Sequence, residues 1–191
     1  PEGRTDDPQI EAIFESIHSA AREIDVSFCG GHTEITVGLD RPIVIGQMLG
    51  EVGREDLVRS SGLEVGDRLL MTKGLGVEAT SLLAREIAVV LAEKGIDAET
   101  LARARNYLHD PGISILQEAR IACDSARVHA MHDPTEGGVA TALLELATAS
   151  NVGLSVTAEA LFASDETHRL CAACGIDPLG VISSGALLIG L

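Results

Sequence analysis

The stretch from His132 to Gly138 combines the side chains and the backbone that an anion site requires. Its sequence is His-Asp-Pro-Thr-Glu-Gly-Gly, and an Ala/Leu-rich segment with helical composition, residues 139–149, follows it. A turn of this kind at a helix start leaves backbone N–H groups unpaired, and these can bind an anion. The Asp133 carboxylate could hold a divalent metal that contacts the same anion. The first hypothesis is a phosphate or Mg-nucleotide site, but taken alone the pattern favours the alternative, an Asp or Thr helix cap with glycines for packing.

Two further clusters place glycines beside polar side chains at the ends of expected strands. They are Gly30-Gly31-His32-Thr33-Glu34 and Lys73-Gly74-Leu75-Gly76. Neither has the GxxxxGK[ST] pattern of a P-loop or the GxGxxG fingerprint of a dinucleotide site. The chain also contains no G-x-S-x-G elbow and no HExxH pair, which disfavours the serine hydrolase and zinc enzyme classes.

The composition predicts an acidic protein with an aliphatic core. Hydrophobic residues make up 46% of the 191 residues and aromatic residues only 2%, and 14 Lys plus Arg stand against 29 Asp plus Glu, a net charge of −15. Nucleic-acid binding requires excess cations and commonly aromatic stacking, so DNA and RNA are not expected partners. A protein with this charge needs metal ions and backbone N–H groups to bind a polyanion such as ATP.

The cysteines and the apolar runs indicate the compartment. The four cysteines, Cys29, Cys123, Cys171 and Cys174, are irregularly spaced, so a disulfide framework is not expected. The lone CxxC pair, Cys171 and Cys174, is interpreted as small buried helix residues rather than as zinc ligands. No apolar run reaches the length of a membrane span and no signal peptide is visible, so we expect a cytoplasmic protein without membrane contact. Both chain ends are expected to be cuts within a longer protein.

The periodicity of apolar residues predicts an α+β fold in which helices cover a sheet. We expect helices over residues 8–23, 77–94, 97–107, 113–123, 139–149 and 166–174. We expect strands over residues 26–29, 43–52, 68–72, 153–156 and 185–191, and another just before residue 132. Asp7 is expected to cap the first helix and Pro8 to begin it.

The order of the three glycine clusters resembles the AIR synthase superfamily. This group contains aminoimidazole ribonucleotide synthase, selenophosphate synthetase, thiamine-monophosphate kinase and the hydrogenase maturation protein HypE. The Gly30-Gly31-His32-Thr33 turn is similar to the glycine-glycine turn of the family. Residues 131–143 resemble the Arg-Asp-Pro-Thr-Arg-Gly-Gly-Leu motif of HypE, and residues 174–179 also resemble HypE. Residues 41–50 and 72–80 look most like the archaeal HypE-like, AIR-synthase-related proteins.

The resemblance implies a domain organisation and a mode of assembly. Residues 1–52 would be the C-terminal part of an α/β N-terminal domain, which pairs with its twin in a homodimer. Residues 60–191 would be an incomplete C-terminal α+β domain with a mixed sheet covered by helices. ATP and Mg would bind between the two domains. The segment that carries the family's acidic metal ligands and ATP lysine is absent from this sequence.

The resemblance also assigns roles to residues. Asp133 would be the carboxylate near Mg, with a helix cap as the alternative. The nucleotide would be bound by Gly30, Gly31, His32, Thr33, Lys73, Gly74, Thr135, Gly137 and Gly138. Each has a structural alternative: packing for the glycines, a cap for Thr135, and a surface position for Lys73. No catalytic residue is assigned. Glu136 stands where HypE has Arg, so a cation that could bind an anion is missing.

Two functions are compatible with these residues. The resemblance implies an ATP- and Mg-dependent enzyme that activates a small-molecule substrate by phosphoryl transfer, as a HypE-like hydrogenase maturation protein. The alternative is a non-catalytic accessory protein that keeps the fold and binds a nucleotide or metabolite. The Asp-x-Thr-x-Gly-Gly pattern favours the enzyme, and Glu136 favours the accessory protein. The sequence does not identify the acceptor substrate.

Overall fold

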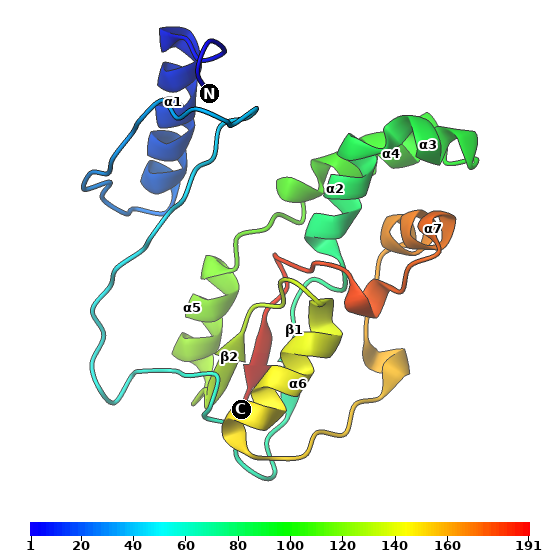
Figure 1. The fold of residues 1–191 in the computed structure, drawn as a ribbon. Coiled ribbons are helices and arrows are strands. Elements are labelled where there is room, and N and C mark those ends of the chain that lie inside the picture. The colour runs from blue at the N-terminus through cyan, green and yellow to red at the C-terminus, as the bar shows by residue number, and fades with distance from the viewer. The chain divides into compact units, whose positions relative to one another are not determined.

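The computed structural model describes residues 1–191, which divide into two compact units, Pro1–Val52 and Gly53–Leu191 (Figure 1). The first unit contains one helix and extended chain. The second contains a small sheet and the remaining helices, and together they give the α+β architecture that the sequence predicts.

The helix of the first unit, α1 (Asp7–Glu23), begins one residue before the predicted start at Pro8. The cap is Asp6 rather than Asp7, and its side chain accepts a hydrogen bond from the Gln9 amide at 3.0 Å. Pro8 lies in the first turn, where a missing N–H costs nothing. Phe28 packs edge-on against the ring of Phe14 with centroids 6.3 Å apart, so the chain after α1 folds back along the helix.

The strands expected at residues 26–29 and 43–52 are not formed. A strand exists only when a neighbouring strand accepts and donates its backbone hydrogen bonds, and the first unit contains no such neighbour. The apolar side chains of the second segment remain exposed as a result. Ile45, for example, is 91% exposed.

The sheet of the second unit has three short strands in the order β1-β3-β2, and both pairs are antiparallel. The strands are β1 (Leu69–Met71), β2 (Ala130–His132) and β3 (Leu188–Gly190). The central strand comes last in the sequence, so segments far apart in the chain meet in the sheet (Figure 1). The register pairs His132 with Leu188, which fixes the point where the 133–137 loop leaves the sheet.

One face of the sheet packs against α6 (Gly138–Ser150). Side chains alternate between faces along a strand, so Leu69 and Met71 contact this core while Leu70, which is 51% exposed, points the other way. The buried residues of this core are Leu63, Leu75, Ala130, Val139, Ala142, Leu146, Ala163 and Leu188. The core fixes the end of β2 and the start of α6, and these two elements hold the loop between them.

A second core is formed by α2 (Val77–Glu86), α3 (Ala88–Glu93), α4 (Ala98–Arg105) and α7 (Asp165–Cys174). We expected one helix over residues 77–94, but Ile87 has a non-helical backbone (φ −126°, ψ 30°) and divides it. Ile87 packs against this core, so the break lets both helices turn apolar residues toward α4 and α7. Gly175 ends α7 in the left-handed conformation, as its position after the helix predicts.

The remaining elements are shorter. They are α5 (Leu116–Ser125) and the 3-10 turns η1 (Asn106–Leu108), η2 (Ala158–Ala160) and η3 (Pro178–Gly180). The strand expected at residues 153–156 is absent, and the one expected at residues 185–191 is reduced to β3. None of the helices combines the length and the apolar character that a bilayer span requires.

Candidate functional site

The loop between β2 and α6 exposes the carboxylate that the sequence singles out. Asp133 is exposed, and its side chain makes no hydrogen bond or ion pair within the protein. The residue after it, Pro134, is fully buried. The Thr135 carbonyl accepts a hydrogen bond from the Gly138 amide at 3.0 Å and closes a turn. The backbone of the loop is therefore anchored while the Asp133 carboxylate faces solvent.

The start of α6 has no side-chain cap. The capping residue is Gly137 (φ 80°, ψ 2°), and no side chain accepts from the first-turn amides. The alternative in which Asp133 or Thr135 caps this helix is therefore wrong. An uncapped helix start retains N–H groups that can bind an anion, which is the arrangement expected at a phosphate site.

The two glycines of the motif are required by packing. A Cβ on Gly138 would lie 2.6 Å from the carbonyl oxygen of Val181, and a Cβ on Gly137 would lie 2.8 Å from the Cβ of Thr141. The Gly138 amide is already used in the turn with Thr135. The packing explanation for Gly138 is thus satisfied by the structure without any ligand.

His132 occupies the end of β2 next to Asp133. Its Nδ1 lies 3.1 Å from the carbonyl oxygen of Asp133, and its Nε2 lies 2.8 Å from Oε2 of Glu145 on α6. The sequence did not indicate this pair, because the two residues belong to different elements and have no characteristic spacing.

Lys73 is engaged inside the protein. Its Nζ donates to the carbonyl oxygens of Gly112 at 3.0 Å and Ser114 at 2.6 Å, and it forms an ion pair with Oε1 of Glu118 at 2.9 Å. An ammonium group has three donors, and these partners use all of them. The side chain is only 12% exposed. The structure gives Lys73 a role in fixing the segment before α5, and leaves it no free donor for phosphate.

Gly74 lies in the same turn and has φ 142°. A Cβ there would come within 2.8 Å of Cδ1 of Phe162. The next amide, that of Leu75, donates to the Phe162 carbonyl at 2.9 Å. The absence of a side chain at Gly74 therefore lets Phe162 pack directly against the backbone of this turn.

The candidate residues of the first unit line a groove of about 710 Å³ beside α1. Apolar residues of the helix, including Ile13 and Ile17, form part of its wall. His32 is exposed and its Nε2 lies 3.6 Å from Oε2 of Glu34. The candidates that line the groove are Gly30, Gly31, His32 and Thr33.

The residues of the 133–138 loop fit one mode of magnesium and ATP binding. No group of three or more His, Cys, Asp or Glu side chains is arranged to hold a metal. Magnesium is commonly held by one or two carboxylates together with substrate phosphates and water, and Asp133 can supply one such carboxylate. The uncapped α6 start is placed in the same loop and can contact the phosphates.

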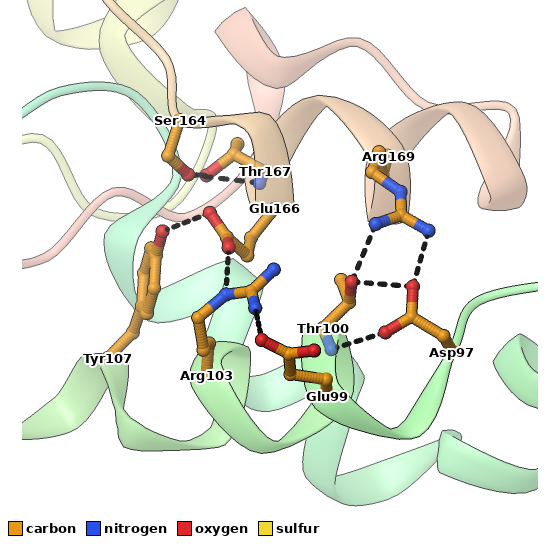
Figure 2. A network of polar contacts seen from close by, with 9 residues as sticks. All are labelled: Asp97, Glu99, Thr100, Arg103, Tyr107, Ser164, Glu166, Thr167 and Arg169. Atoms are coloured by element: carbon orange, nitrogen blue, oxygen red, sulfur yellow. Dashed lines mark hydrogen bonds and ion pairs between the residues drawn. The ribbon is translucent and has the colours of Figure 1, made fainter.

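A network of charged and hydroxyl side chains joins α4 to α7 (Figure 2). Arg103 Nε lies 2.6 Å from Oε1 of Glu166, and the Tyr107 hydroxyl lies 2.9 Å from Oε2 of the same carboxylate. The Arg103 guanidinium holds the pKa of Glu166 below its usual range. Both oxygens of Glu166 are therefore occupied by structural partners.

The second half of this network is centred on Asp97 (Figure 2). Asp97 accepts from the Thr100 amide at 2.8 Å, as a helix cap, and from the Arg169 guanidinium at 2.8 Å. The backbone N–H of Thr100, followed by Arg169, lowers the pKa of the Asp97 carboxyl far below its ordinary value. The cap could be foreseen from the sequence, but the Arg169 partner could not, since it lies on a distant helix. Every charged group drawn in Figure 2 has an opposite partner, so this network fixes the two helices and leaves no group free for chemistry.

Comparison with known proteins relates the chain to one family. A family model described as the C-terminal domain of AIR synthase related proteins matches residues 64–191. A Methanocaldococcus jannaschii protein, whose name refers to hydrogenase expression/formation, is 30% identical over 183 residues, which cover 95% of this chain and 51% of the relative. Carbamoyl dehydratase HypE of Rhizobium leguminosarum bv. viciae is 27% identical over 185 residues, which cover 94% of this chain and 49% of the relative.

A solved structure has the same fold along the chain. It is hydrogenase maturation protein HypE in complex with ATP, which superimposes with a TM-score of 0.69 and 19% identity over 98% of this chain and 53% of that one. The chain spans about half the length of the curated relatives it matches.

Proposed function

Because the chain belongs to the AIR synthase related family through the C-terminal domain of that family, we propose that it forms part of an ATP- and Mg-dependent enzyme of the HypE type. The proposed reaction transfers the γ-phosphoryl group of ATP to a small-molecule substrate and thereby activates it. The proposal concerns the natural polypeptide in which these residues occur, acting as a homodimer in the cytoplasm.

One observation carries the proposal: an exposed carboxylate without an internal partner lies beside an uncapped helix start. Asp133 would hold magnesium, which supplies positive charge to the phosphates when bound. The first-turn amides of α6 orient the phosphate oxygens. The buried Pro134 and the Thr135–Gly138 turn keep this surface in place without a ligand.

The other candidate residues have different roles in the proposed site. Gly30, Gly31, His32 and Thr33 are proposed to contact the nucleotide because of their family resemblance. Gly74, Gly137 and Gly138 are proposed to shape the loops rather than to donate to phosphate, since their space is taken by neighbouring atoms. Lys73 is left out of the phosphate contacts because its donors are used by Glu118 and two carbonyls.

The proposal is tested by calorimetric titration of the natural polypeptide with ATP in the presence and absence of Mg. Replacement of Asp133 by Asn keeps the side-chain shape and removes the charge, so we expect Mg-ATP affinity to fall about tenfold or more. Asp124→Asn is the matched control, because Asp124 is also exposed and lies on α5. Binding that does not require Mg, or equal affinities for the two variants, would contradict the proposed site.

A second candidate function is a non-catalytic protein that binds a nucleotide or metabolite. The exposed Glu136 near the start of α6 favours it, because a second carboxylate repels the charge that develops on a transferring phosphoryl group. The internal engagement of Lys73 favours it as well. Mg-ATP binding without ADP formation in the presence of cell-extract metabolites would support this function over the enzyme.

A further inference from the structure

We propose that His132 and Glu145 are positioning residues that fix the backbone of Asp133 for binding of a metal-bound phosphate. This inference rests on the proposed function and assigns new roles within the same site. His132 is the last residue of β2, and Glu145 lies on α6. The pair therefore ties together the two elements that hold the loop.

The imidazole ring of His132 bridges two acceptors. Nδ1 lies 3.1 Å from the Asp133 carbonyl oxygen, and Nε2 lies 2.8 Å from Oε2 of Glu145. The donor and acceptor roles of the two ring nitrogens depend on the tautomer, and the nitrogen that carries the proton donates to the oxygen it faces. The ring is 18% exposed and is held on both sides. Glu145 thereby orients the ring, and the ring orients the peptide unit of Asp133.

The peptide unit that joins Asp133 to Pro134 is restricted by a second means. Pro134 is fully buried, and a residue that precedes proline is restricted to extended backbone conformations. The amide of Gly138 closes the turn on the carbonyl of Thr135. With the peptide unit between Asp133 and Pro134 held and His132 paired with Leu188 in the sheet, the Asp133 carboxylate keeps rotation about its own side-chain bonds as its main freedom. Loss of hydrogen bonds that support a metal ligand typically lowers metal affinity by about 10–100-fold.

A simple stabilising ion pair is the competing explanation. Glu145 is 57% exposed, and exposed pairs contribute little to stability. The molecule offers a matched control just before the start of β2, where His129 Nδ1 lies 2.9 Å from Oδ1 of Asp67. That pair has the same chemistry and a more buried carboxylate, and its side chains make no hydrogen bond to the 133–138 loop.

The test compares Glu145→Ala with Glu145→Gln in the natural polypeptide, because a glutamine amide oxygen still accepts from His132. We expect Glu145→Ala and His132→Ala to weaken Mg-ATP binding about tenfold and Glu145→Gln to retain affinity. Amide hydrogen exchange of residues 133–138 without nucleotide should accelerate in the two alanine variants. His129→Ala should lower the melting temperature but leave the Mg-ATP affinity and the amide exchange of residues 133–138 unchanged.

Two results would overturn the inference and can be told apart from failure of the proposed function. If Asp133→Asn weakens Mg-ATP binding while His132→Ala and Glu145→Ala do not, the function stands and the positioning role is wrong. If exchange of residues 133–138 is unaltered in the alanine variants, the positioning role is wrong whatever nucleotide binding shows. If Asp133→Asn has no effect, the proposed function fails and the inference fails with it.

Discussion

Substitution of Gly138 by alanine tests whether this glycine serves packing or ligand approach. Gly138 has φ +64°, a left-handed conformation that L side chains rarely adopt. An added Cβ would lie 2.6 Å from the Val181 carbonyl oxygen and 2.9 Å from the Gly180 carbonyl carbon. Both atoms belong to the backbone at the end of η3, so neither can move away by a change of rotamer.

The expected cost has two parts. The left-handed conformation costs a non-glycine residue about 1–2 kcal/mol. Displacement of the packed backbone adds about 1–3 kcal/mol, as for other overpacking substitutions. Gly175→Ala isolates the first part, because Gly175 has a similar φ of +69° and a Cβ there meets nothing within 4 Å. Gly138→Ala should therefore lower the free energy of unfolding by about 1–3 kcal/mol more than Gly175→Ala.

Urea denaturation of both variants measures this difference, provided that the slopes of the unfolding curves are equal. Equal losses for Gly138→Ala and Gly175→Ala would refute the packing explanation. Gly138 would then be conformationally required but sterically free, which is what close approach to a phosphate demands.

Three further predictions concern contacts outside the loop. Lys73→Met should lower the free energy of unfolding by about 3 kcal/mol, measured in urea, because it leaves Glu118 as a largely buried charge without its partner. The pKa of the Asp97 carboxyl is lowered from its ordinary value of 3.8 by the Thr100 amide and then by Arg169, so its contribution is present above about pH 4 and lost as the pH falls below it. Asp97→Asn should therefore unfold with a weaker dependence on pH in that acid range. Burial raises the pKa of the Cys171 thiol to about 11, so iodoacetamide at pH 8 should label the exposed Cys123 and reach Cys171 only after unfolding.

Each of these three predictions would be contradicted by a specific result. A Lys73→Met protein as stable as the parent would show that the ammonium group is free for another task. An unchanged dependence of stability on acid pH in Asp97→Asn would show that the Thr100 amide and Arg169 do not hold the pKa of the Asp97 carboxyl below its ordinary value. Labelling of Cys171 at the rate of Cys123 would mean that α7 opens in the native state.

The sequence predicted the helices well because their signals are local. The proline of α1 and the glycine after α7 lie within a few residues of the helix ends that they mark, although the cap of α1 is Asp6 and not the predicted Asp7. The family resemblance, based on the order of three glycine clusters, is confirmed by the match over residues 64–191. The fold class is confirmed as well, since solved HypE structures share the fold along the chain.

The strands were predicted less well because a strand depends on its neighbours. Residues 43–52 are predominantly apolar, yet they find no partner strand within their unit. The partners of Lys73 were unpredictable for the same reason. Gly112, Ser114 and Glu118 lie about 40 residues away, and only the tertiary fold brings them to the ammonium group.

The residues of the 132–138 motif have different structural roles. Gly138 is explained by packing, the Thr135 carbonyl by its turn, and His132 by its bridge to Glu145, whereas the Asp133 carboxylate makes no hydrogen bond or ion pair within the protein. The exposed Glu136 adds a negative charge close to it, in a chain whose net charge is −15. With Lys73 bound internally, this loop has no cation of its own with which to offset a polyphosphate. If ATP binds here, the compensating charge must come from a metal or from residues outside the loop, so Mg dependence is the property that best distinguishes this site from one built on an arginine.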